Sequence, residues 1–170
     1  MKSQLKHFKY WLIFLIFCLS YFFLLVSNAS SESLIGKVIA VHDGDTITLQ
    51  NESGYKKIRL AGIDAPELKQ PYGAESRAAL RAVVFERQVQ VDATKSDKYG
   101  RWVGKVILDG QDINLQHVQA GMAWVYRDFV KELSKEDKVL YLEAEHLSKK
   151  TEVGLWKETH PVTPWVWRQK

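Results

Sequence analysis

The chain has 170 residues, of which 46% are hydrophobic and 26% charged, a composition that predicts one ordinary globular domain with at most a short additional segment. Three of its 24 Lys and Arg residues precede an apolar N-terminal stretch, so 21 basic residues face 20 acidic ones in the rest of the chain. This near-neutral balance excludes nucleic-acid binding by bulk charge alone, and any phosphate binding must come from a local cluster of Arg and Lys.

The first 29 residues have the pattern of an export signal. Three lysines precede an uncharged run over residues 10–26, and small residues then allow cleavage before Ser30. The run is slightly short of the ~20 apolar residues of a membrane span, which favours a cleaved signal peptide over an uncleaved N-terminal anchor. Either interpretation predicts an exported domain that is secreted, periplasmic, or held at the membrane outside the cytoplasm. The single cysteine, Cys18, lies in this run, so a processed domain uses no disulfide.

Five short strands follow, each of them alternating in polarity or rich in β-branched residues. They are predicted over residues 34–41, 46–50, 56–60, 89–92 and 102–108. Turn signals at residues 43–45 and 51–54 join the first three strands into a meander.

Three helices are predicted, over residues 75–87, 114–120 and 135–150, with Asn114 as the cap of the second helix and Gly121 as its end. Their inward faces should include Leu80, Val83 and Val84 in the first helix, and Leu140, Ala144 and Leu147 in the third. We expect His117, on the second helix, to have a partly buried structural role and no role in catalysis. Five strands with a helix between the third and fourth predict a mainly β fold, a five-stranded OB-fold barrel with accessory helices.

The predicted barrel domain spans residues 30–157, and a tail of residues 158–170 follows it. The tail contains two prolines and two tryptophans, Trp165 and Trp167. Large apolar rings at a chain end most often fasten it to the domain, so we expect this tail to pack on the barrel domain.

Three segments carry polar residues suited to chemistry on a phosphate. The first, residues 42–46, is an acidic turn between two strands, and by itself it predicts only turn geometry. The second, residues 58–67, follows a strand end, where functional sites often lie, and the third, residues 97–101, precedes the fifth strand. Together they supply the side chains of Asp45, Arg59, Asp64, Glu67 and Arg101.

The order, content and spacing of these segments resemble those of the staphylococcal nuclease (thermonuclease) family, over residues 34–156. The resemblance implies a five-stranded OB-fold barrel with three α-helices, in agreement with the elements read from the sequence. It also implies an enzyme, a calcium-dependent nuclease that hydrolyses phosphodiester bonds in DNA and RNA without sequence preference. The resemblance likewise implies cleavage as an endonuclease that leaves 3′-phosphates. Neither the residue types nor their spacing shows this.

The resemblance assigns roles residue by residue. The Ca²⁺ ligands would be Asp45, Asp64 and, through its main-chain carbonyl, Ala65, where the family often has Thr. The catalytic residues would be Arg59, Glu67 and Arg101. The two arginines would clamp the phosphate, and Glu67 would act on the attacking water, either as a general base or by orienting it.

Elementary chemistry supports these roles. Attack on a phosphodiester builds negative charge on the phosphoryl oxygens, and an Arg binds two such oxygens at once without losing its proton. Oxygen ligands with no His or Cys beside them favour Ca²⁺ or Mg²⁺ over zinc. A weak site, with a dissociation constant of ~10⁻⁴ to 10⁻³ M, is sufficient outside cells.

Three aromatic residues are candidates for substrate contact, namely Tyr99, Trp124 and Tyr126. Stacking on a base contributes ~1 to 3 kcal/mol without reading sequence, which favours single-stranded or breathing regions of DNA and RNA. The alternative for each ring is packing within the protein. The expected partners are DNA and RNA substrate and, only if the N-terminal segment stays uncleaved, the membrane. We predict a monomer.

A catalytically inactive OB module that binds nucleic acid or protein at the cell envelope is the alternative function. Such modules typically lose the site carboxylates or arginines, and this chain retains all of them.

Overall fold

A computed structural model describes residues 32–130 and 132–169. The chain divides into two compact units, residues 1–31 and 32–170, and the second contains all the strands and helices given below. The predicted export segment lies outside the described residues and stays a prediction. Among the residues that are described, no helix is long and apolar enough to cross a membrane.

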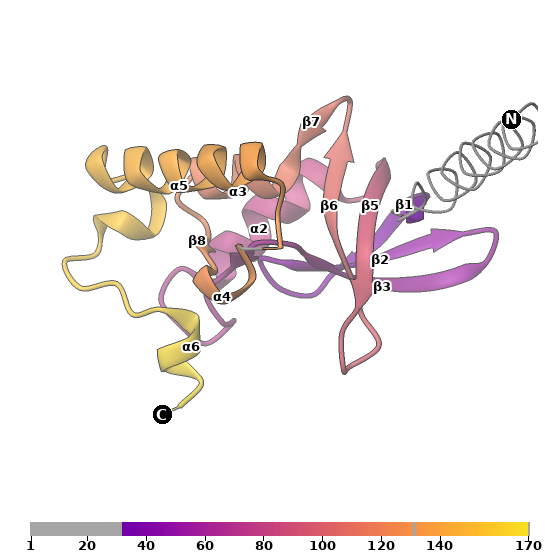
Figure 1. Ribbon diagram of the computed structural model, residues 1–170. Helices are drawn as coiled ribbons and strands as arrows, with labels where there is room; N and C mark the ends of the chain where they lie inside the picture. The colour runs from indigo at the N-terminus through magenta and orange to yellow at the C-terminus, as the bar shows by residue number, and fades with distance from the viewer. Residues whose placement is uncertain (1–31, 131, 170) are drawn as a thin grey trace, which may run out of the picture. The chain divides into compact units, whose positions relative to one another are not determined.

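Five strands close into a barrel (Figure 1), and they are β1 (Glu32–Val41), β2 (Thr46–Asn51), β3 (Gly54–Leu60), β5 (Gln88–Ser96) and β6 (Trp102–Leu108). Neighbouring strands pair in the order β3-β2-β1-β5-β6, and a parallel pairing of β3 with β6 closes the circle. This is the strand order of an OB-fold, so the predicted fold class is confirmed.

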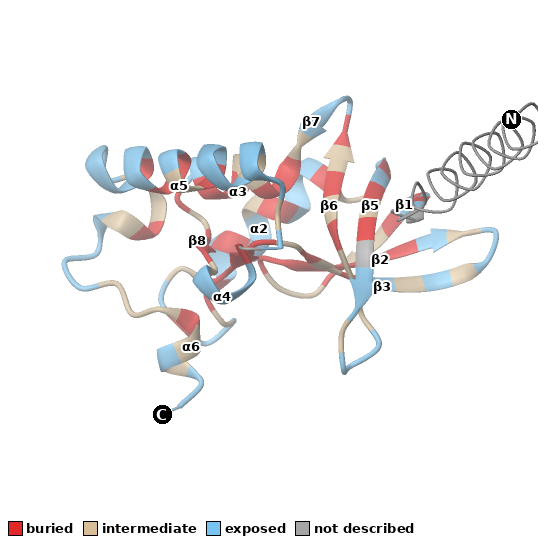
Figure 2. Cartoon of the chain, in the orientation of Figure 1, coloured by how far each residue is buried: buried red, intermediate tan, exposed pale blue. Residues whose placement is uncertain are grey.

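The barrel forms because apolar side chains alternate with polar ones along the strands and pack into one core. Buried and exposed residues accordingly follow one another along the strands (Figure 2). The fully buried residues of this core include Val38, Ile47, Leu49, Ile58, Val91 and Val106. All five predicted strands are confirmed, and each observed strand contains the predicted range. The tight turns at residues 42–45 and 52–53 give the predicted antiparallel meander of β1, β2 and β3.

The three predicted helices are present as α2 (Gly73–Val84), α3 (Ile113–Gln119) and α5 (Lys135–Lys150). Helices α3 and α5 lie side by side at one end of the barrel (Figure 1). Three short helical turns were not predicted, namely α4 (Arg127–Val130), η1 (Gly154–Lys157) and α6 (Pro164–Trp167). Two residue pairs form a small second sheet of β4 (Ile63–Asp64) and β8 (Trp124–Val125), and β7 (Gln111–Asp112) extends the main sheet.

The prediction of the inward face of α5 was partly wrong. Leu140 and Leu147 are exposed, whereas Tyr141 and Glu145 are buried. Polar contacts select this face, because the Tyr141 hydroxyl donates to Asp112 at 2.9 Å and Glu145 accepts from a main-chain N–H. The spacing of apolar residues alone does not predict a helix face that is buried through such polar contacts. In α2, Val83 is likewise exposed, while Leu80 and Val84 are buried as predicted.

Asn114 does not cap α3. Asp112 is the cap, and its carboxylate accepts from the N–H of Leu115 at 3.0 Å. Asn114 is fully buried instead, where its side chain accepts from the N–H of Val106 at 3.1 Å and donates to the carbonyls of Ala61 at 3.0 Å and Gly104 at 3.2 Å. The residue therefore ties β6 to the segment that leaves β3.

Candidate active site

The acidic turn between β1 and β2 is held by its own polar groups. The N–H of His42 donates to the carbonyl of Thr46 at 2.8 Å, and the N–H of Asp45 donates to the Asp43 carboxylate at 3.0 Å. Gly44 must be glycine here, because an added Cβ would lie 1.9 Å from the hydroxyl oxygen of Ser76. Asp43 thus fixes the turn, and Asp45 is free to project toward the site.

A buried pair of side chains supports this turn from α2 and α3. The Ser76 hydroxyl donates to the carbonyl of Met122 at 2.7 Å, and His117 Nε2 lies 3.0 Å from the same hydroxyl oxygen. Since the hydroxyl has one proton, His117 must donate from Nε2, which fixes its tautomer. Burial lowers the pKa of His117 to about 4, so this imidazole is neutral near pH 7. His117 is therefore structural, as the sequence indicated.

The small sheet of β4 and β8 positions the second acidic residue. Asp64 lies opposite Trp124 in this pairing, and Ile63 lies opposite Val125. The N–H of Val125 donates to the buried Glu145 carboxylate at 2.9 Å, which fastens β8 to α5. Asp64 is consequently held by a rigid strand, with its side chain only 2% exposed.

Asp45, Asp64 and Arg59 meet at one point. Arg59 Nη2 lies 2.9 Å from Asp64 Oδ1 and 3.2 Å from Asp45 Oδ2. Asp45 also accepts from the N–H of Ala65 at 2.7 Å and from the Thr46 hydroxyl at 3.1 Å. The structure therefore brings together the two acidic residues and the first arginine that the sequence singled out.

The electrostatics of the cluster favour a cation. Burial raises the pKa of Asp45, the Arg59 guanidinium opposes this shift, and the neighbouring Asp64 carboxylate adds to it. The two close, buried carboxylates share the single guanidinium of Arg59, so a second positive charge is needed to complete their neutralisation. Among the described residues no group of three or more His, Cys, Asp or Glu side chains is arranged around a metal position. A cation here would accordingly be held by these two carboxylates, main-chain oxygen and water, a ligand set that suits Ca²⁺.

Glu67 lies on the loop between β4 and α2, and this loop is closely packed. The N–H of Glu67 donates to the side-chain oxygen of Gln70 at 3.2 Å, and the carbonyl of Glu67 accepts from the N–H of Gln70 at 2.8 Å. An added Cβ on Gly73 would lie 1.9 Å from the Glu67 carbonyl oxygen, so α2 begins directly against this residue. The Glu67 side chain itself is 38% exposed and remains accessible to water.

Arg168, near the C-terminus, is a site residue that the sequence did not reveal. Its guanidinium contacts Asp64 Oδ2 at 2.8 Å, Asp64 Oδ1 at 3.3 Å and Glu67 Oε1 at 2.7 Å. The hydrogen bond to Asp64 raises the pKa of Arg168, and the contact with Glu67 acts in the same direction. The only sequence signal was an arginine directly after the aromatic tail segment that we expected to pack on the domain.

Arg101 lies in the loop before β6, and its ion-pair partner is Asp97. Its side chain forms an ion pair with Asp97, with Nε and Nη2 each 2.7 Å from Asp97 Oδ2. Burial acts to raise the pKa of Asp97, but hydrogen bonds from Arg101 and Tyr99 lower it overall. The Arg101 guanidinium also lies 5.5 Å from the ring centroid of Tyr99, which is 72% exposed. This loop presents an open aromatic face beside a cation.

The other two aromatic candidates are placed differently. Trp124 is only 4% exposed, and its ring packs edge-on against Trp156 with centroids 5.4 Å apart. The structure does not place it where a base could stack on it. Tyr126 is half-buried, with its ring 5.4 Å from Trp165 in a stacked arrangement and 4.9 Å from Phe129. A base would have to displace Trp165 to reach the face that this tryptophan covers.

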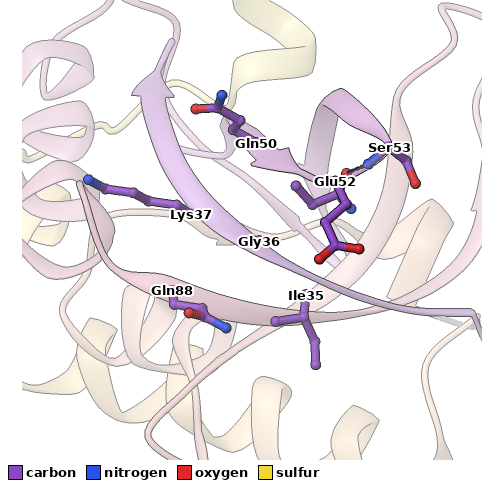
Figure 3. Close-up of a pocket in the computed structure, with 8 residues that line it drawn as sticks. Ile35, Gly36, Lys37, Gln50, Glu52, Ser53 and Gln88 are labelled. Atoms are coloured by element: carbon purple, nitrogen blue, oxygen red, sulfur yellow. Dashed lines mark hydrogen bonds between the residues drawn. The ribbon is translucent and has the colours of Figure 1, made fainter.

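A surface hollow of about 480 Å³ lies elsewhere on the barrel (Figure 3). Its lining includes Lys37 on β1, Gln50 on β2, Glu52 in the β2–β3 turn and Gln88 at the start of β5. These positions are at the opposite ends of β1 and β2 from the acidic turn. The hollow is therefore separate from the candidate site.

Comparisons with known proteins agree with this geometry. A family model described as "Staphylococcal nuclease homologue" matches residues 57–158, a range that includes Arg59, Asp64, Glu67 and Arg101. The chain is 37% identical to Protein ParB of Escherichia coli over 156 residues, which cover 86% of each chain. It is 38% identical to an uncharacterized endonuclease of Escherichia coli O157:H7 over 136 residues, covering 79% of this chain and 85% of the relative. It is also 36% identical to a micrococcal nuclease of Shigella flexneri over 155 residues, covering 86% and 87%.

Proposed function

This chain belongs to the staphylococcal nuclease family, and we propose that it is a calcium-dependent nuclease that hydrolyses phosphodiester bonds in DNA and RNA. The observation that carries the proposal is the contact of Arg59 with both Asp45 and Asp64. This arrangement offers one position for a divalent cation and, beside it, a guanidinium for the phosphate that the cation would bind. The names of the relatives, which include endonucleases and a micrococcal nuclease, support the same activity.

The chain's own residues would hold the cation. Asp45 and Asp64 would supply carboxylate oxygens, and the main-chain carbonyl of Ala65 would add a third protein ligand. Bound Ca²⁺ supplies positive charge beside the phosphoryl oxygens and anchors the substrate. Because these ligands are all oxygen atoms, with no His or Cys among them, they suit Ca²⁺ better than zinc.

The remaining steps fall to Glu67 and the two arginines. Glu67, which is accessible to water, would orient the attacking molecule or accept its proton. Arg59 would leave its carboxylate partners and donate two N–H groups to the phosphate as charge builds on the oxygens. Arg101 would break its ion pair with Asp97 and bind the same phosphate. In-line attack on phosphorus would then displace the 5′-oxygen and leave a 3′-phosphate, an expectation from the family resemblance.

Substrate binding would be independent of sequence and would favour single-stranded or breathing regions. Tyr99 supplies the exposed aromatic face for this, since any base can stack on such a ring. Tyr126 would contribute only in a state in which Trp165 has moved. We further propose an exported monomer, secreted, periplasmic or anchored by its N-terminal segment.

The experiment is a cleavage assay with the full-length chain, plasmid DNA and RNA, in Ca²⁺ or in a calcium chelator. Cleavage should occur only with Ca²⁺, and end analysis should find 3′-phosphates. We expect Arg59→Ala to lower the rate about 10²- to 10³-fold, since it removes one donor to the developing charge. Glu67→Ala should lower it about 10²- to 10⁴-fold.

Arg87→Ala is the matched control. Arg87 pairs with the exposed Asp109 at 2.9 Å, so its loss removes one positive charge without touching the cluster, and the rate should stay near that of the wild type. Cleavage that persists in the chelator would refute the calcium dependence. Binding of nucleic acid without any cleavage would identify the chain as an inactive OB module.

A further inference from the structure

The C-terminal tail lies against the candidate site. The side-chain amide of Gln70 donates to the carbonyl of Val162, and Pro164, the first residue of α6, is buried. Trp165 then stacks on Tyr126, with ring centroids 5.4 Å apart and an angle of 17° between the planes. These interactions hold the tail in place, and Arg168, one residue beyond α6, contacts Asp64 and Glu67.

Arg168 occupies the oxygens that the proposed mechanism needs. Both oxygens of Asp64 accept from it, at 2.8 and 3.3 Å, and Glu67 Oε1 accepts at 2.7 Å. Asp64 Oδ1 is also bonded to Arg59 at 2.9 Å. A divalent cation that approaches Asp64 therefore meets a guanidinium already in position, and the two like charges repel each other.

The charges of the cluster favour an exchange. Asp45, Asp64 and Glu67 carry three negative charges, and Arg59 neutralises one of them. Arg168 neutralises one more, whereas a divalent cation in its place would neutralise both that remain. The cation can therefore displace Arg168, but only at a concentration high enough to compensate for the lost hydrogen bonds.

We propose that Arg168 competes with the cation for Asp64 and Glu67, and that the C-terminal tail thereby sets the cation concentration at which the enzyme works. The inference rests on the proposed cation site. It makes Arg168 a residue that determines cation affinity, and it makes Trp165 a positioning residue, because its stacking on Tyr126 keeps Arg168 within reach.

The test is a calorimetric titration of CaCl₂ into the full-length chain without nucleic acid. Arg168→Gln should lower the dissociation constant for Ca²⁺ roughly three- to tenfold, because the competing charge-assisted hydrogen bonds are gone. Trp165→Ala should change it in the same direction by less. Arg87→Gln, which removes the same charge at an exposed pair, should leave the dissociation constant unchanged. An unchanged or higher dissociation constant in Arg168→Gln, or no calcium binding by any variant, would overturn the inference.

Cleavage measured in parallel separates this inference from the proposed function. If Arg168→Gln binds Ca²⁺ more tightly but no variant cuts DNA or RNA, the nuclease proposal fails and the competition stands. If the wild type cuts in Ca²⁺ but Arg168→Gln has the wild-type dissociation constant, only the competition fails.

Discussion

Acidification should weaken the fold through His117. Burial holds the pKa of this imidazole at about 4, against 6.5 for an exposed histidine. Because the unfolded chain binds the proton more readily, stability is complete above pH 6.5 and is lost as the pH falls toward 4. Between pH 7.5 and 4.5 this linkage amounts to about 2 to 3 kcal/mol of unfolding free energy. His117 contacts Ser76 under the acidic turn, so the loss should begin at the support of the active site.

The assay is urea unfolding at pH 7.5 and pH 4.5, followed by far-UV circular dichroism. His117→Gln keeps an N–H for the Ser76 hydroxyl but does not titrate, so the wild type should lose about 2 to 3 kcal/mol more than this variant on acidification. His146→Gln removes an exposed histidine and should behave as the wild type does. Equal losses in the wild type and in His117→Gln would refute the reasoning.

Three further substitutions test the scaffold of the site. Asn114→Ala should cost about 2 to 4 kcal/mol in urea unfolding, because three main-chain groups lose their buried partner; a cost below about 1 kcal/mol would contradict this role. Gly44→Ala should cost about 1 to 3 kcal/mol and also slow cleavage, because its Cβ would lie 1.9 Å from the Ser76 hydroxyl. Wild-type stability and rate in that variant would show that the turn can relax. Glu145→Ala should cost about 1 to 3 kcal/mol in thermal unfolding by leaving the buried N–H of Val125 unpaired, and an unchanged melting temperature would argue against it.

The barrel could be predicted from sequence because its determinants are local. Alternating apolar residues specify each strand, and the turn residues at 43–45 and 51–54 specify the hairpins between them. The helices were harder, because polar residues decide how they pack. Asn114 looks like a helix cap in the sequence, yet its side chain makes three hydrogen bonds inside the protein. Tyr141 and Glu145 similarly turn α5 away from the face that its leucines suggested.

The candidate site divides in the same way. Asp45 precedes β2, Arg59 lies near the end of β3 and Asp64 lies in β4. The fold fixes the order of these strands, so the convergence of the three residues follows from it. Arg168 could not be found by this route, because its contact with Asp64 joins residues 104 positions apart through a tail with no strand of its own. Trp124 was misleading for a related reason. Its pairing with Asp64 places its backbone next to the site, but its ring packs into the protein interior.

The parallel contact between β3 and β6 has a consequence for folding. This contact pairs Ile58 with Trp102, and α2 and β5 lie between these two residues in the chain. It can therefore form only after the long intervening segment has been ordered. Contacts of this kind make folding slow and place the last seam of the barrel late in the process. The β2–β3 hairpin aligns Arg59 with Thr46, next to Asp45, by local pairing, so the β3–β6 seam is expected to close the barrel around a contact that forms without it.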